Sequence, residues 1–286
     1  MNAEVQGRSA AEKFRADHHL GVQPLGDLMA VIEQTTGLDV AVLDAGPDEH
    51  GLTMRDPARG AVFIGVARTA RPMRQRSTLA HELGHVLFED WVDSSAVNWG
   101  GRDHAEKRAD AFARHLLLPL DGLREFLAGQ EMPTQATLSA VVQLFVVSPA
   151  IAAIQLHEGG HIDAATKQEW MAITTPRLSA RFGWSDQYRA LQAESNHRRA
   201  PQRLLARAIK GYAESVVSAQ TIATLRGISV AEAEAELAEA GVVPIDQQVG
   251  WAGSADLPVV DVDLDDLEAD LTVAGSEDDR REPDAP

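Results

Sequence analysis

Apolar residues along most of the chain recur at intervals of three and four, which is the spacing of an amphipathic helix. The first two segments with this spacing are 10–19 and 25–36, and Gly37 provides a stop signal for the second. Three short runs of apolar or β-branched residues follow, with turn-forming Asp, Gly and Pro between them, at 38–43, 51–55 and 61–66. The pattern predicts two helices followed by a small β-sheet.

Helical spacing returns after residue 70 and continues to residue 240, except over residues 161–184. Five helices are expected in the first part of this stretch, over 74–91, 103–118, 119–127, 134–145 and 149–157. Pro119 suits the first turn of its helix, because a proline there removes no intrahelical hydrogen bond. A second helical block is expected over 186–240.

These elements predict an α+β fold, in which a mainly helical core carries a small sheet over residues 1–160. A turn at Gly159-Gly160 precedes residues 161–184, which we expect to be a linker. A C-terminal helical domain is expected over 185–254, and residues 255–286 form an acidic tail.

The composition excludes several classes of protein. The chain has 286 residues and no Cys, so it is not a disulfide scaffold, and with 44% hydrophobic residues it is not globally disordered. Its longest apolar run, 140–147, is interrupted by Gln143 and is too short to cross a bilayer. Residues 1–20 contain no apolar stretch of signal-peptide length. We expect a cytoplasmic protein with no membrane partner.

The negative charge is concentrated at the C-terminal end. The net charge is −17, and residues 255–286 contain 12 acidic and two basic residues, so the tail contributes −10 and the first 254 residues −7. A segment with this much like charge and little apolar surface is expected to be disordered. The total charge is therefore weak evidence about what the rest of the chain binds.

The strongest chemical signal is the run His81-Glu82-Leu83-Gly84-His85. On a helix, positions four residues apart share a face, so both imidazoles can bind one Zn²⁺ at about 2.0–2.1 Å. Glu82 then lies beside the open coordination position, where it can accept a proton from water. The flanking residues are mostly apolar, as expected for a metal-binding helix packed into a core.

A catalytic zinc with two histidine ligands needs a third protein ligand and an open fourth position. In the helix predicted over 103–118, Glu106 and Asp110 share a stripe with Ala109 and Ala113, whose small side chains favour close helix packing. Glu106 is the candidate ligand. Asp110, one turn later, can accept the second ring N–H of a ligand histidine and fix its tautomer.

Two other interpretations of this helix stay open. His104 is an alternative third ligand, which would make a site of three histidines. Glu106 and Asp110 could also form an ordinary solvated face paired with Lys107 and Arg108.

Two segments have the spacing of helix-turn-helix units, 138–160 and 206–241. A recognition helix must offer cations or amides to phosphates and bases. The second helix of the first unit, 149–157, has no Lys or Arg, and that of the second, 230–240, has four Glu. We therefore expect both helix pairs to pack in a core or face a protein partner, and direct DNA binding is not expected. A basic cluster over 197–210 is a candidate surface for an acidic partner or for the chain's own acidic tail.

The two motifs together resemble those of the ImmA/IrrE family of zinc metallopeptidases: the run from Arg76 to His85, and the pattern Glu106-x-x-Ala109-Asp110 with the apolar run after it. The similarity extends over 24–157. It implies a zincin-like, gluzincin-type minimal peptidase core. It also implies a biological substrate, namely a helix-turn-helix transcriptional repressor whose cleavage relieves repression in a mobile-element, phage or stress response.

The chemistry expected of this site is hydrolysis of a peptide bond. Zinc bound by His81, His85 and Glu106 would lower the pKa of a water and polarise the scissile carbonyl, and Glu82 would carry the proton to the leaving amine. If residues 62–64 form an edge strand, a substrate could pair along them. The donor that stabilises the oxyanion is unassigned, with several candidates: Arg76, His104, His115, His157, Tyr188 and Tyr212.

A regulatory module without catalytic activity, which binds a protein partner or DNA, is the alternative function. Such a module would have no use for Glu82, whereas a peptidase requires it. All the residues expected of the metal site are present, which favours the enzyme.

Overall fold

A computed structural model of the chain describes residues 2–46, 51–56, 58, 60–91, 99–129 and 132–245, with the backbone alone at 99–103. The tail and its predicted disorder lie outside the described residues. The elements of the first half are α1 (Ala3–Asp17), α2 (Leu28–Thr36), β1 (Asp39–Leu43), β2 (Gly51–Asp56), β3 (Ala61–Ala67), α3 (Pro72–Leu87), α4 (Trp99–Leu117) and α5 (Leu120–Leu127). Those that follow are α6 (Gln135–Phe145), α7 (Pro149–Glu158), α8 (Ala164–Met171), α9 (Thr175–Arg181), α10 (Ser185–Ser195), α11 (Gln202–Ala213), α12 (Ala219–Arg226) and α13 (Val230–Glu239). The predicted α+β class is confirmed.

The sheet has the strand order β1-β3-β2, with β1 parallel and β2 antiparallel to β3. β3 is therefore the central strand. Residues 62–64 do not form an edge strand, so a substrate cannot pair along them. Ile64 and Val66 of β3 are buried, as expected for a strand paired on both sides. β2 is an edge strand, and its Leu52 and Met54 are exposed.

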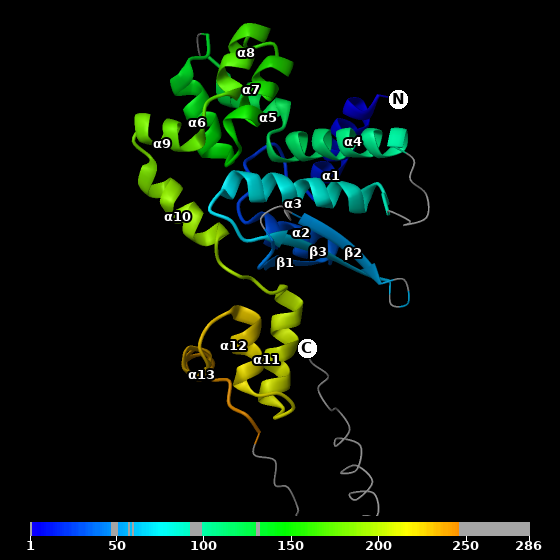
Figure 1. Ribbon diagram of the computed structural model, residues 1–286, viewed down its shortest axis with the longest axis vertical. Coiled ribbons are helices and arrows are strands. Elements are labelled where there is room, and N and C mark those ends of the chain that lie inside the picture. Colours follow the sequence, from blue (N-terminus) through cyan, green and yellow to red (C-terminus); the bar gives the residue numbers. More distant parts are fainter. Residues whose placement is uncertain are drawn as a thin grey trace, which may run out of the picture. The chain divides into compact units, whose positions relative to one another are not determined.

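Helix α3 lies between the sheet and α4, and α1 packs along α4 (Figure 1). Close contact between α3 and α4 depends on small side chains. A Cβ added at Gly84 would lie 3.2 Å from the Cα of Ala109 and 3.2 Å from a ring carbon of Phe112. The sequence predicted this close approach from the alanines of α4, and Gly84 is the matching small residue on α3.

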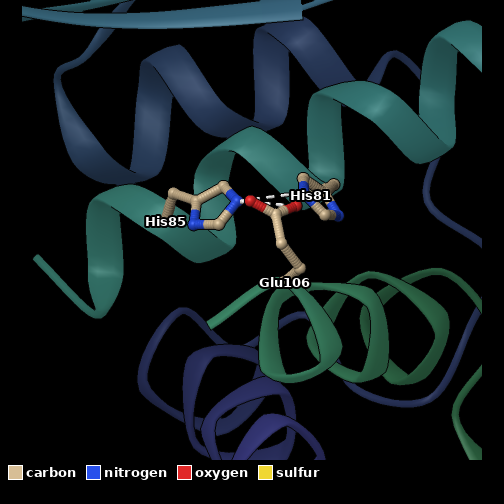
Figure 2. A group of neighbouring side chains, drawn as sticks. All are labelled: His81, His85 and Glu106. Carbon is tan, nitrogen blue, oxygen red and sulfur yellow. Dashed lines mark hydrogen bonds and ion pairs between the residues drawn. The ribbon is translucent and has the colours of Figure 1, made fainter. Parts of the chain in front are cut away.

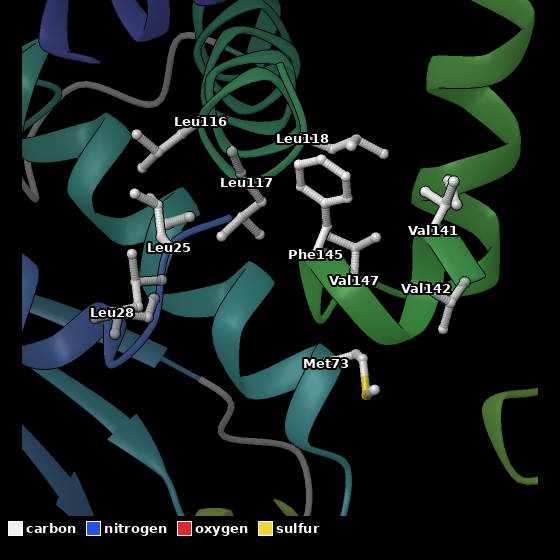
Figure 3. Close-up of a cluster of buried hydrophobic side chains, with 14 of the residues drawn as sticks. Leu25, Leu28, Met73, Leu116, Leu117, Leu118, Val141, Val142, Phe145 and Val147 are labelled. Carbon is white, nitrogen blue, oxygen red and sulfur yellow. The ribbon is translucent and has the colours of Figure 1, made fainter. Parts of the chain in front are cut away.

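The main core consists largely of aliphatic side chains, as the low aromatic content predicts (Figure 3). Figure 3 shows where several elements meet in it, with labelled side chains from α3, α4, the α6–α7 corner and the segment around α2: Leu25, Leu28, Met73, Leu116, Leu117, Leu118, Val141, Val142, Phe145 and Val147. Half of the residues of α7 are buried here, including Ala152, Ala153 and Leu156. The buried residues of α6 and α7 agree with the prediction that this pair packs in a core.

Residues 161–184 are not a linker. They form α8 and α9, and Trp170 and Leu178 from these helices belong to the main core. The Trp184 indole N–H donates a hydrogen bond of 2.9 Å to the Ser139 hydroxyl of α6. The prediction was wrong because α8 and α9 are short and place few apolar residues on the buried side, so their periodicity is weak.

The second helical block begins later than the predicted residue 185. Tyr188 and Leu191 of α10 pack with the main core, whereas α11, α12 and α13 share a separate small cluster. Its buried members are Ala219, Ile222, Ala223, Ala233 and Leu237. Among the described residues, no single helix is long and apolar enough to cross a membrane; α6 and α7, which meet at 110°, reach that length and composition only as a pair.

Leu178→Ala is expected to lower the free energy of unfolding by about 2–5 kcal/mol, because it removes a fully buried side chain and leaves a cavity. Urea denaturation measures the change. Arg177→Ala, at the exposed neighbouring position, is the matched control and should change stability by less than about 0.5 kcal/mol. Equal effects of the two substitutions would restore the linker interpretation.

Candidate metal centre

His81 and His85 lie one turn apart on α3 and share a face, as the sequence predicted. Pro72 occupies the first turn of the helix, and the interior of α3 contains no further proline. The two Nε2 atoms are 2.9 Å apart, and the ring centroids are 4.6 Å apart. Both imidazoles therefore direct the same nitrogen to one point.

Glu106 of α4 completes a group of three at that point (Figure 2). Its Oε2 lies 3.2 Å from His81 Nε2 and 3.7 Å from His85 Nε2. Three ligand atoms on a tetrahedral zinc with bonds of 2.0–2.1 Å would be separated by about 3.3 Å. The three observed separations, 2.9, 3.2 and 3.7 Å, lie on both sides of this value. The donor set and its geometry fit zinc.

Asp110 contacts the first histidine as predicted. Its Oδ1 accepts a hydrogen bond of 2.8 Å from His81 Nδ1. This bond lowers the pKa of the Asp110 carboxyl below its ordinary value, and the Arg114 charge acts in the same direction. Burial lowers the pKa of His81, but Asp110, Glu106 and Glu82 together outweigh it, and the pKa is raised. A hydrogen bond at Nδ1 leaves the Nε2 lone pair of His81 free for a metal.

His85 has a carboxylate partner that the sequence analysis missed. Asp90 Oδ2 lies 3.3 Å from His85 Nδ1, and Arg108 of α4 donates a hydrogen bond of 2.5 Å to Asp90 Oδ1. The helix predicted to reach residue 91 ends at Leu87, and the chain then turns back toward the histidine. The available signal was an acidic residue a few positions after the second histidine, but helical spacing placed it on another face.

Glu82 is held by the edge strand β2. The Thr53 hydroxyl donates a hydrogen bond of 2.7 Å to Glu82 Oε2. At Gly51, two residues earlier on the same face, an added Cβ would lie 2.8 Å from Glu82 Oε1 and 2.5 Å from Thr78 Cγ2. Glycine is therefore needed here for close approach. The sequence analysis identified this strand but not its contact with Glu82.

A cleft of about 780 Å³ opens at the metal centre. It is lined by residues of β2, α3, α4 and the start of α7: Gly51, Ser77, Thr78, His81, Glu82, Glu106, Asp110, Ala113, Arg114, Ser148 and Ile151. Three carboxylates lie in this lining against one arginine, a charge balance that favours a bound cation. The cleft gives the centre access to a substrate.

None of the six oxyanion candidates from the sequence lines this cleft. Arg76 instead donates hydrogen bonds to the carbonyls of Leu25 and Gly26, and His115 is buried against Glu4. His104, the alternative third ligand, is exposed and lies outside the group formed by the two α3 histidines and Glu106.

A second group of potential ligands comprises Glu4, His115 and Glu158. His115 Nε2 lies 3.1 Å from Glu4 Oε1 and 3.4 Å from Glu158 Oε2. Arg114 is 2.5 Å from the other oxygen of Glu4 and 3.9 Å from Glu158, so both carboxylates already pair with the guanidinium of this residue. We interpret this group as an ion-pair network that joins α1, α4 and the end of α7.

Residues 35–157 match the Peptidase_M78 family, described as the IrrE N-terminal-like domain. All five residues predicted for the site lie within the match: His81, Glu82, His85, Glu106 and Asp110. No curated protein sequence matches the chain. The resemblance inferred from the two motifs is confirmed for this segment.

Proposed function

We propose that this protein is a zinc-dependent endopeptidase. Its residues 35–157 match the IrrE N-terminal-like peptidase domain. The observation that carries the proposal is the convergence of His81 Nε2, His85 Nε2 and Glu106 Oε2, with Glu82 beside them in an open cleft. A zinc ion held by these three residues supplies a Lewis acid and a water of lowered pKa.

The residues of the chain have separate tasks in this proposal. Glu82 takes a proton from the attacking water and passes it to the nitrogen of the leaving amine, so that one carboxylate acts first as base and then as acid. Asp110 fixes the tautomer of His81 through the 2.8 Å hydrogen bond at Nδ1. Glu82 is not itself among the three grouped ligands, which leaves it available for proton transfer.

We propose that the substrate main chain pairs with the edge of β2 that has no partner strand among the described residues. This strand pairs with β3 on one side, and its Thr53 and Gly51 lie against Glu82, so a peptide added to the other side would run past the metal centre. Main-chain pairing supplies affinity with little demand on sequence. Selectivity would then come from the side chains that line the cleft.

We propose that the substrate is a helix-turn-helix transcriptional repressor. This proposal rests on the family resemblance. The test is incubation of the purified protein with Zn²⁺ and with the helix-turn-helix protein encoded nearest to its gene, followed by mass spectrometry of the products. One discrete cut is expected, and chelation of the metal should prevent it. An intact repressor together with cleavage of other proteins would overturn this choice of substrate.

Thr53→Val is expected to lower kcat for peptide hydrolysis by about tenfold with little change in KM. The reason is that it removes one hydrogen bond to an ionised carboxylate, worth about 1.5 kcal/mol, without changing the substrate edge. Steady-state kinetics on a peptide that spans the cleavage site measure both constants. Thr53→Ser keeps the hydroxyl and should retain most of the rate. Equal losses in the two variants would show that packing, and not the hydrogen bond, matters.

A further inference from the structure

The chain makes an unusual turn directly after the metal-binding helix. Glu89 has a φ of +54°, a left-handed conformation that costs energy for a residue other than glycine. The next residue bonds back to the last turn of α3, since the Asp90 backbone N–H donates a hydrogen bond of 2.9 Å to the carbonyl of His85. The turn therefore places the Asp90 side chain beside the imidazole five residues earlier.

The Asp90 carboxylate joins two elements. One oxygen lies 3.3 Å from His85 Nδ1, and the other accepts a 2.5 Å hydrogen bond from the Arg108 guanidinium of α4. The guanidinium carbon lies 4.0 Å from the ring centroid of Phe88, which holds the arginine on a second side. The Asp90 and Arg108 side chains are only 16% and 19% exposed. Water therefore competes weakly for these contacts.

We propose that Asp90 and Arg108 are positioning residues for the metal site, forming what we call the Asp90–Arg108 clamp. This inference rests on the proposed metal centre. Asp90 accepts a hydrogen bond from the Nδ1–H of His85 and so keeps the Nε2 lone pair directed at the metal. Arg108 is two residues from Glu106, so the clamp also sets the distance between the histidine ligand on α3 and the carboxylate ligand on α4.

The two histidines are thus oriented by carboxylates of different kinds. Asp110, the partner of His81, is 64% exposed, whereas Asp90 is largely buried and paired with an arginine. A carboxylate that is shielded from water and held by a second residue constrains an imidazole more tightly. We therefore expect the loss of Asp90 to affect metal binding at least as strongly as the loss of Asp110.

The test is the affinity of the metal-free protein for Zn²⁺, measured by competition with a chromophoric chelator. Asp90→Asn is expected to weaken binding by about 10- to 100-fold, the usual effect of removing a carboxylate behind a histidine ligand. Arg108→Gln should weaken it in the same direction by a smaller factor. The visible absorption of the Co²⁺-substituted protein should change in both variants, because the geometry of His85 at the metal is altered.

Glu89→Gln is the matched control for Asp90→Asn, because it removes the same charge from the exposed neighbouring position. Lys107→Gln is the control for Arg108→Gln. Both controls should bind Zn²⁺ within about twofold of the parent protein. Circular dichroism and the melting temperature of the metal-free proteins establish that each variant folds. If Asp90→Asn does not fold, Arg108→Gln still tests the clamp, because it leaves the Asp90 carboxylate intact.

The outcomes separate this inference from the proposed function. A parent protein that binds no stoichiometric Zn²⁺ would refute the metal centre and the clamp together. A parent protein that binds Zn²⁺, with Asp90→Asn and Glu89→Gln showing equal affinity, would overturn only the clamp.

Discussion

Glu82→Gln is expected to abolish peptide hydrolysis while the protein keeps its fold and its metal. General base and acid catalysis by a positioned side chain contributes about 10²- to 10⁴-fold, and kcat/KM should fall by at least this factor. The amide has nearly the same shape as the carboxylate and can still accept the hydrogen bond from Thr53, but it has no basicity. Single-turnover cleavage of the repressor measures the loss, and elemental analysis measures the retained metal.

The matched control for this variant is again Glu89→Gln, which makes the same chemical change near the site without touching the cleft. It should retain nearly full activity. A Glu82→Gln enzyme that cleaves at close to the parent rate would eliminate Glu82 as the base. Absence of hydrolysis in the parent protein, on the repressor and on a broad peptide library, would instead favour the regulatory binding module.

The local parts of the site could be predicted because helical spacing alone determines them. His81 and His85 are four residues apart on one helix, and so are Glu106 and Asp110, so each pair shares a face whatever the rest of the chain does. Ala109 and Ala113 of α4 also signalled that α3 and α4 approach closely, and the structure adds Gly84 as the small residue on α3. The structure brings these four residues together as the sequence predicted.

The parts that were missed depend on contacts that no local pattern contains. The position of β2 at the edge depends on which strand pairs with β3, and hydrophobic patterning does not determine strand order. Asp90 reaches His85 only because the chain leaves the helix at Leu87 and Glu89 adopts a left-handed conformation, which a non-glycine residue seldom does. The alternative interpretation made Arg108 a partner of a solvated Glu106–Asp110 face, whereas its guanidinium pairs with Asp90 across the helix interface.

Purified protein is expected to contain close to one zinc ion per chain, and Glu106→Gln is expected to lose it. Removing a residue behind a ligand already costs about 10- to 100-fold in affinity, so replacing a charged ligand by a neutral amide should cost more than about 100-fold. Elemental analysis of the purified proteins and chelator competition measure the two quantities. His104→Ala should bind zinc as tightly as the parent protein does. His104 is exposed and does not belong to the group formed by His81, His85 and Glu106.

Glu106→Gln and His104→Ala together decide whether Glu106 or His104 is the third metal ligand, a choice that the sequence left open. If Glu106→Gln kept its zinc while His104→Ala lost it, the site would contain three histidines, and Glu106 would belong to the solvated face of α4. The distances oppose that result, because Glu106 Oε2 is 3.2 Å from one Nε2 and 3.7 Å from the other, and an ion of zinc's size would bind in the space between them. Glu106 would also bring a negative charge to a bound zinc, which a third neutral imidazole would not, and this charge would moderate the Lewis acidity that the ion supplies to a bound water.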